Sequence, residues 1–88
     1  MSKCPRVLLV DDHATILERT VKVLEHDCTI VGAVADGQSA LDAAAILRPD
    51  VVVLDISMAG MCGLEVATRL RDARPAPATQ LRICERVL

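Results

Sequence analysis

The chain has 88 residues, 52% of them hydrophobic and none aromatic, with a formal net charge of −2. This length predicts a single domain, and the apolar content at low net charge excludes a disordered chain. Apolar runs far shorter than the ~20 residues of a bilayer span exclude a membrane protein, and near-neutral charge without aromatic side chains argues against nucleic acid as a direct partner.

The first part of the chain predicts two strands separated by a helix. Arg6–Asp11 contains a continuous apolar run, which indicates a strand buried on both faces, as in a parallel sheet. Ala14–His26 has helical periodicity, with apolar side chains at i, i+4 and i+7 counted from Leu17. Thr29–Val34 is rich in β-branched residues and predicts a second, shorter strand.

The middle of the chain repeats this alternation. Asp36, followed by glycine, indicates a turn and a helix entry, and the Ala-rich segment Ser39–Leu47 predicts a helix that ends before Pro49. Val51–Ile56 is the most β-prone segment, and Leu64–Ala73 returns to helical periodicity. Strands that alternate with helices predict an α/β fold with a parallel sheet and helices on both faces.

The last residues fit two structures. A stiff, proline-rich connector begins at Pro75. Alternating apolar residues favour a short strand at Leu81–Cys84, although the spacing of Leu81, Cys84 and Leu88 also fits a helix. We therefore divide the chain into a core of three βα units, residues 1–74, and a tail, residues 75–88.

Four cysteines, Cys4, Cys28, Cys62 and Cys84, are far apart in the sequence. This spacing lacks the close ligand pairs of a zinc site. Without a secretory context we expect reduced, mostly buried thiols, and hence a cytoplasmic protein.

Three aspartates follow two of the predicted apolar strands: Asp11 and Asp12 after the first, and Asp55 at the end of the third. If these strands are neighbours, the carboxylates meet at the carboxyl edge of the sheet, where open α/β sheets bind ligands. Carboxylates this close repel one another, and Mg²⁺, which prefers oxygen ligands, would relieve the repulsion. An aspartate in such a site can accept a phosphoryl group as an acyl phosphate.

Simpler interpretations compete at each position. An aspartate at a strand end is often a turn former or a helix cap, but three together favour a site. His13 could be a metal ligand, although a histidine in this place is more often a solvated loop residue. Met58 and Met61 are interpreted as loop packing, and no dinucleotide-binding glycine pattern follows any strand.

Four ordered motifs run along the chain: Arg6–His13 (RVLLVDDH), Asp36–Leu41 (DGQSAL), Arg48–Met58 (RPDVVVLDISM) and Gly63–Glu65 (GLE). Together they resemble the receiver domain of bacterial two-component response regulators. The opening motif is similar to the subfamily that usually carries a helix-turn-helix output domain. The resemblance covers residues 5–74 and implies a flavodoxin-like (CheY-like) sheet with strand order 2-1-3.

The resemblance also implies roles for single residues. Asp55 would be the residue that a sensor histidine kinase phosphorylates, and a small phosphodonor such as acetyl phosphate could also serve. Asp12 would bind Mg²⁺ directly, Asp11 would support it through water, and Ser57 would offer its backbone carbonyl. The receiver would be a phosphoryl acceptor and not an enzyme.

The chain departs from the family pattern in several places. Ala59 stands where a proline is usual, no lysine follows Lys22, and no Ser or Thr follows Thr79. A five-unit receiver uses a strand-five lysine and a strand-four Ser or Thr, so we interpret the chain as a C-terminally truncated receiver. Its uncovered sheet edge predicts a homo-oligomer, formed by edge pairing or by swapping of tail segments.

Two other functions stay open. An incomplete receiver could act only as a self-association or protein-interaction module, without phosphorylation. A Mg²⁺-dependent hydrolase with an aspartate nucleophile is less favoured, because it needs a second carboxylate two residues after the nucleophile, where Ser57 stands.

Overall fold

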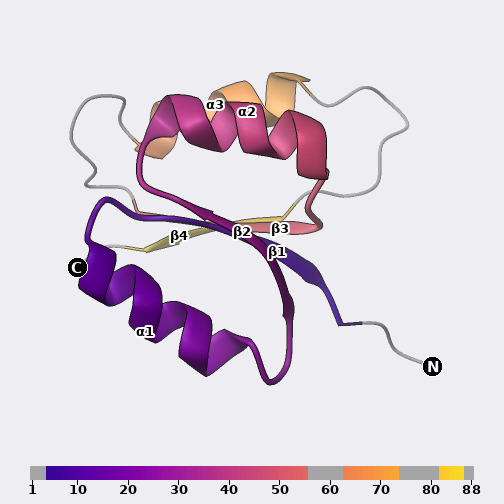
Figure 1. The fold of residues 1–88 in the computed structure, drawn as a ribbon. Coiled ribbons are helices and arrows are strands. Elements are labelled where there is room, and N and C mark those ends of the chain that lie inside the picture. The colour runs from indigo at the N-terminus through magenta and orange to yellow at the C-terminus, as the bar shows by residue number, and fades with distance from the viewer. Residues whose placement is uncertain (1–3, 56–62, 74–81, 87–88) are drawn as a thin grey trace.

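The computed structural model of the protein describes residues 4–55, 63–73 and 82–86. Strands and helices alternate along the chain (Figure 1). In chain order they are β1 (Arg6–Val10), α1 (Ala14–Leu24), β2 (Thr29–Val34), α2 (Gly37–Leu47), β3 (Val51–Asp55), α3 (Gly63–Ala73) and β4 (Arg82–Arg86). The predicted α/β architecture is therefore confirmed.

The strands form one parallel sheet in the order β2-β1-β3-β4. Helices α2 and α3 cover one face of the sheet and α1 covers the other (Figure 1). This confirms the order 2-1-3 and the helices on both faces. The tail forms a strand beside β3, as favoured, at Arg82–Arg86 instead of Leu81–Cys84. Residues 75–81 of the tail lie outside the described residues.

The hydrophobic core lies between the sheet and the α2/α3 layer. Strands β1 and β3 contribute alternate side chains, because successive residues of a strand point to opposite faces. The buried members are Leu8, Val10, Ala40, Val52, Leu54, Val66, Ala67 and Leu70. These positions are apolar in the sequence runs from which the buried strands were predicted.

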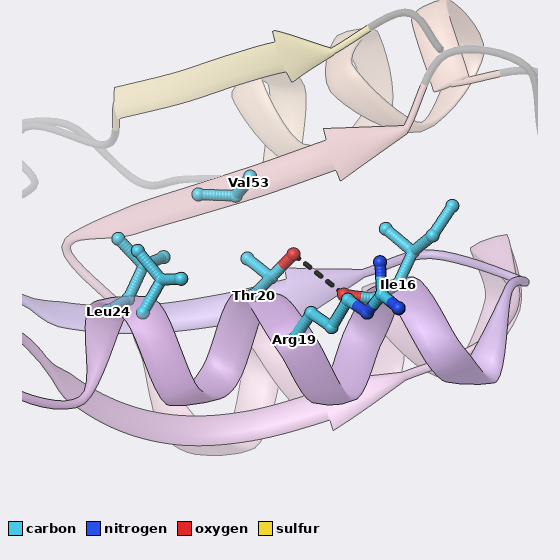
Figure 2. Close-up of a pocket in the computed structure, with 6 residues that line it drawn as sticks. Ile16, Arg19, Thr20, Leu24 and Val53 are labelled. Atoms are coloured by element: carbon cyan, nitrogen blue, oxygen red, sulfur yellow. Dashed lines mark hydrogen bonds between the residues drawn. The ribbon is translucent and has the colours of Figure 1, made fainter.

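Among the helices that the structure describes, α1 is the one that covers its face of the sheet. None of its residues, all of which the structure describes, is fully buried. A groove of about 540 Å³ lies between this helix and β3, and its lining includes Ile16, Leu24 and Val53 (Figure 2). Within it, the Thr20 hydroxyl donates to the Ile16 carbonyl at 2.8 Å, so this polar group is satisfied by its own helix.

Contacts at the start of β1 fix the position of β3. The Arg6 amide donates to the Asp50 carboxylate at 3.0 Å, and the Asp50 amide donates to the Arg6 carbonyl at 2.8 Å. The Arg6 guanidinium also donates to the Arg48 carbonyl at 3.0 Å. These bonds hold the α2–β3 turn against β1 and set the register in which Val10 pairs with Leu54. The residues that follow this pair, Asp11 and Asp55, must then lie side by side.

Local hydrogen bonds set the helix boundaries and correct two predicted ones. Asp36 accepts from the Ser39 amide at 2.8 Å and so caps α2, which begins at Gly37 and not at Ser39. Helix α1 ends at Leu24 and not at His26, because the Leu24 carbonyl accepts from amides of the following turn.

The described thiols differ from the sequence expectation. Cys4 is exposed and Cys28 is half-buried, and neither forms a disulfide. The side chains of Cys62 and Cys84 lie outside the described residues. The prediction of buried thiols is therefore wrong for Cys4, which lies before the first strand and is exposed.

Candidate functional site

Two neighbouring strands end in buried carboxylates. Asp11 follows β1 and Asp55 is the last residue of β3, and each is 1% exposed. The Asp11 amide donates to the Val34 carbonyl at 3.1 Å, which extends the β1–β2 pairing past the end of β1. Backbone pairing on both sides of β1 therefore fixes the position of the Asp11 backbone, from which its side chain extends.

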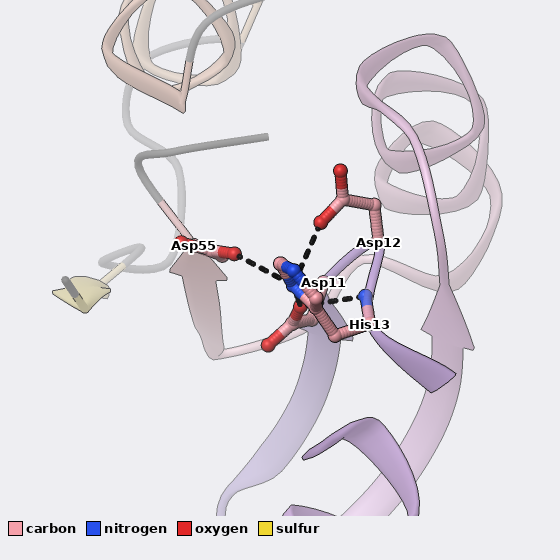
Figure 3. Close-up of side chains that lie close together, drawn as sticks. All are labelled: Asp11, Asp12, His13 and Asp55. Atoms are coloured by element: carbon pink, nitrogen blue, oxygen red, sulfur yellow. Dashed lines mark hydrogen bonds and ion pairs between the residues drawn. The ribbon is translucent and has the colours of Figure 1, made fainter. Parts of the chain in front are cut away.

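The predicted acidic cluster is formed, and it includes a histidine. One ligand atom each from Asp11, Asp12, His13 and Asp55 lies within 4.8 Å of all the others. Figure 3 shows these four side chains pointing toward one another. The two buried carboxylates lie at the carboxyl ends of β1 and β3, whereas the Asp12 side chain is 27% exposed. The cluster is thus open to solvent on the side of Asp12 and His13.

His13 lies close to all three carboxylates of this cluster. Its Nδ1 lies 3.1 Å from Asp11 Oδ1, 3.0 Å from Asp12 Oδ1 and 3.7 Å from Asp55 Oδ2. The hydrogen bond to the Asp11 side chain raises the pKa of His13 above its usual value, and the Asp12 charge acts in the same direction. The carboxylates therefore favour the protonated form of the imidazole.

The N-terminus of α1 begins beside the cluster. His13 is the N-cap residue, and its own amide donates to Asp11 Oδ1 at 2.9 Å. The first amides of a helix carry partial positive charge, which favours nearby anions. The backbone therefore lowers the electrostatic cost of gathering these carboxylates at one place.

The donor set fits a divalent cation. Three carboxylates supply oxygen atoms, the ligands that Mg²⁺ takes in proteins. Two of them are buried, and a buried carboxylate is costly to keep ionised without a compensating charge. Their spacing within 4.8 Å allows one ion to contact more than one of them.

The structure brings together Asp11, Asp12 and Asp55 from the predicted site. Ser57 lies outside the described residues, as do Met58, Ala59 and Met61. His13 is exposed and lies in the loop before α1, as favoured from the sequence, but sequence reasoning did not foresee that its Nδ1 lies within 4 Å of all three carboxylates. The signal was its position directly after two aspartates, at the residue before a helix.

The geometry of this edge can be compared with known proteins. Residues 7–83 match the family model of the response regulator receiver domain. The chain belongs to this family. The matched range includes part of the tail that we set apart at residue 74, and that division itself stays a prediction. The family assignment favours the receiver function over an interaction module with a silent site.

Curated relatives carry the receiver as one part of a longer protein. The chain is 37% identical over 81 residues to the transcriptional regulatory protein CseB of Streptomyces avermitilis, covering 92% of this chain and 34% of that protein. It is 42% identical over 79 residues to protein-glutamate methylesterase/protein-glutamine glutaminase 1 of Dechloromonas aromatica, covering 86% of this chain and 22% of that protein. The chain thus spans about a third or less of these relatives. Receiver domains are phosphoryl acceptors and generally not enzymes, and the enzymatic name belongs to the longer protein.

Solved structures support the same fold. The signal receiver domain of the putative response regulator NarL from Mycobacterium tuberculosis superposes with a TM-score of 0.82 at 31% identity, covering 98% of this chain and 68% of that one. A CheY-like receiver domain from Methylobacillus flagellatus gives a TM-score of 0.79 at 25% identity, covering 94% and 70%. The protein is a receiver domain of the two-component response-regulator family. Among the helices that the structure describes, none has the length and apolar character needed to cross a bilayer.

Proposed function

We propose that Asp55 is the phospho-acceptor of this receiver domain. The observation that supports this most strongly is the buried Asp55 carboxylate at the carboxyl end of β3, with ligand atoms of Asp11, Asp12 and His13 within 4.8 Å. A carboxylate can act as a nucleophile and form an acyl phosphate. Asp55 also occupies the place in the motif where the family carries its phospho-acceptor.

In the transfer step, one Asp55 carboxylate oxygen forms a bond to the phosphorus of the donor. The bond between that phosphorus and the leaving group breaks, and the leaving group keeps the electron pair. Acetyl phosphate, for example, would leave as acetate. Burial and backbone pairing with β4 hold Asp55 in place, so little reorganisation is needed before the attack.

We further propose that Asp12 and Asp55 bind Mg²⁺ directly and that Asp11 supports it through water. Ser57 would add its backbone carbonyl by analogy with the family. The chemistry that Mg²⁺ supplies is charge compensation, both for the carboxylates and for the incoming phosphoryl group. Asp11 also orients His13 through the bond from the His13 amide.

The experiment is phosphorylation by acetyl phosphate, with and without Mg²⁺, read by the mass of the intact protein. The wild-type chain should gain one phosphoryl group in Mg²⁺ and none in EDTA, and Asp55→Asn should gain none. Asp72→Asn removes an exposed carboxylate from α3 and should be phosphorylated like wild type. A wild-type chain without an adduct, or an adduct that persists in Asp55→Asn, would refute the proposal.

The partners follow from this chemistry. A sensor histidine kinase or a small phosphodonor would supply the phosphoryl group, in the cytoplasm, and the chain itself would not turn over a substrate. We assign no direct contact with nucleic acid or with a membrane.

We also propose that the chain self-associates. Among the described strands, β2 and β4 form the edges of the sheet, and an edge strand offers backbone groups for pairing. The groove beside α1 and the 70% exposure of Val23 add apolar surface on one face. Light scattering over a wide concentration range should reveal a dimer or larger species, and a monomer throughout would contradict this proposal.

A further inference from the structure

Strand β4 ends in an arginine at the place where its neighbour β3 ends in Asp55. The two strands pair in parallel, and their register joins Leu54 to Glu85 and Asp55 to Arg86. The backbones of paired strands lie about 4.8 Å apart, which is less than the length of an extended arginine side chain. The pairing therefore places Arg86 directly beside the proposed phospho-acceptor.

The register also places both residues on the same face of the sheet. Val52 and Leu54 belong to the core under α2 and α3, whereas Val53 lines the groove beside α1. Because successive residues of a strand alternate between faces, Asp55 shares the face of Val53. Register partners in parallel strands share a face as well, so Arg86 falls on the side of Asp55.

Of the C-terminal residues of the four strands that the structure describes, one is a cation. These residues are Val10, Val34, Asp55 and Arg86. Because the carboxyl ends of parallel strands meet at one edge of the sheet, Arg86 brings positive charge to the edge where the carboxylates gather. No lysine follows Lys22 in the sequence, so a cation from β3 onward has to be an arginine.

The proposed phosphoryl transfer leaves this edge short of positive charge. Three carboxylates exceed the charge of one Mg²⁺ by one unit. The His13 side chain is 53% exposed, so solvent screens the charge that it carries when protonated. The incoming phosphoryl group brings roughly two further negative charges. An additional cation beside Asp55 would therefore stabilise the transferring group, as positioned arginines do in other phosphoryl transfers.

We propose that Arg86 is a catalytic residue of phosphoryl transfer to Asp55, and that its guanidinium binds oxygen atoms of the transferring group. The inference rests on the proposed function of Asp55. Arg86 forms and breaks no covalent bond, because the bond from the Asp55 oxygen to phosphorus forms, and the bond to the leaving group breaks, as described above. A guanidinium keeps its charge near neutral pH and presents N–H donors in a planar fork that matches phosphate oxygens.

The test is the initial rate at which acetyl phosphate phosphorylates the intact chain in saturating Mg²⁺, followed by mass. Arg86→Gln should slow the reaction by about tenfold or more, because one positioned cation is lost at the transferring group. Arg86→Lys keeps the charge without the fork, and its rate should lie between those of Arg86→Gln and wild type. Arg82→Gln is the matched control and should react like wild type. It removes the same charge from the same face of β4, about 13 Å away at the start of the strand.

The affinity for Mg²⁺ separates a catalytic role from a structural one. Arg86→Gln should bind Mg²⁺ at least as tightly as wild type, because the loss of a neighbouring cation removes repulsion. A distorted site would bind Mg²⁺ more weakly. Guanidinium chloride, far below the concentrations that unfold the chain, should accelerate phosphorylation of Arg86→Ala more than sodium chloride does at equal ionic strength.

The outcomes separate this inference from the proposed function. A wild-type rate in Arg86→Gln, or an equal loss in Arg82→Gln, would overturn the inference while Asp55 remains the phospho-acceptor. Slow phosphorylation with weaker Mg²⁺ binding and no recovery in Arg86→Lys would overturn it too, because the loss would then reflect a disturbed site. Slow phosphorylation of Arg86→Gln with undiminished Mg²⁺ binding supports it. If the wild-type chain gains no phosphoryl group, the proposed function fails and the inference fails with it.

Discussion

Replacing Asp55 by asparagine should stabilise the protein in EDTA, because the substitution removes one of two buried like charges. Asp11 and Asp55 are each 1% exposed, and their oxygens lie within 4.8 Å of each other. Two unit charges at 4.8 Å repel by about 3 kcal/mol at an effective dielectric constant of 20. The lost attraction to His13, whose Nδ1 lies 3.7 Å from Asp55 Oδ2, offsets only part of this energy, because the His13 side chain is 53% exposed and solvent screens its charge. We therefore expect a net gain of about 1–2 kcal/mol in the free energy of unfolding.

Magnesium should reduce or reverse this advantage. A cation that binds only the folded state stabilises it by RT ln(1 + [L]/Kd), which is about 1.4 kcal/mol when Mg²⁺ is tenfold above its Kd. Wild type should gain this amount, whereas Asp55→Asn has lost a ligand and should gain little. The difference between the two proteins should therefore shrink or change sign on going from EDTA to Mg²⁺.

Urea unfolding followed by circular dichroism, in EDTA and in Mg²⁺, measures both effects. Asp72→Asn is the matched control, because it removes the same charge from an exposed position of α3. It should leave the stability in EDTA and the response to Mg²⁺ close to wild type. If Asp55→Asn is less stable than wild type in EDTA, or gains as much from Mg²⁺, then the electrostatic account of this cluster is wrong.

Two further predictions test the elements that hold the site. Leu8→Ala in β1 removes a fully buried side chain and should cost about 2–5 kcal/mol by urea unfolding, whereas Ile46→Ala, at a position 79% exposed, should cost less than about 0.5 kcal/mol; equal costs would contradict the assigned core. Asp36→Ala removes the cap of α2 and should lower the melting temperature at pH 7 by a few degrees. Bonds from the amide and hydroxyl of Ser39 hold the pKa of Asp36 below its usual value, so its contribution is present above that usual value and is lost as the pH falls through the lowered one. The difference between wild type and Asp36→Ala should therefore close below about pH 4, and a difference that persists into strong acid would contradict the charge-assisted cap.

The meeting of Asp11 with Asp55 could be predicted because it follows from backbone rules alone. Both residues come after continuous apolar runs, both runs form parallel strands, and strand ends in a parallel sheet share one edge. The place of His13 could not be predicted in this way. It depends on a side-chain rotamer and on the Asp11 carboxylate that receives the His13 amide, and neither is visible in a hydrophobic pattern.

The tail marks a different limit of pattern reasoning. Apolar residues around Leu81 favour a strand but also fit a helix, because a short segment samples too few turns to separate the two periods. Pairing with β3 decides for the strand, in a register that joins Val53 to Cys84 and Asp55 to Arg86. That choice depends on the open edge of β3, which lies far away in the sequence.

Helix α1 shows what an amphipathic pattern does and does not determine. The spacing of Leu17, Val21 and Leu24 correctly predicts the side that turns toward the sheet, because these residues are half-buried while Glu18 and Lys22 are exposed. The pattern cannot determine how deeply that side is buried, since burial depends on every other element that covers the same face. In the described residues α1 is the one helix on its face, so its apolar side borders an open groove while the α2/α3 face forms the closed core. The site can still be well ordered at one end of α1, because Asp11 and His13 are held by β1 and by the first turn of the helix, and neither depends on what lies over the groove.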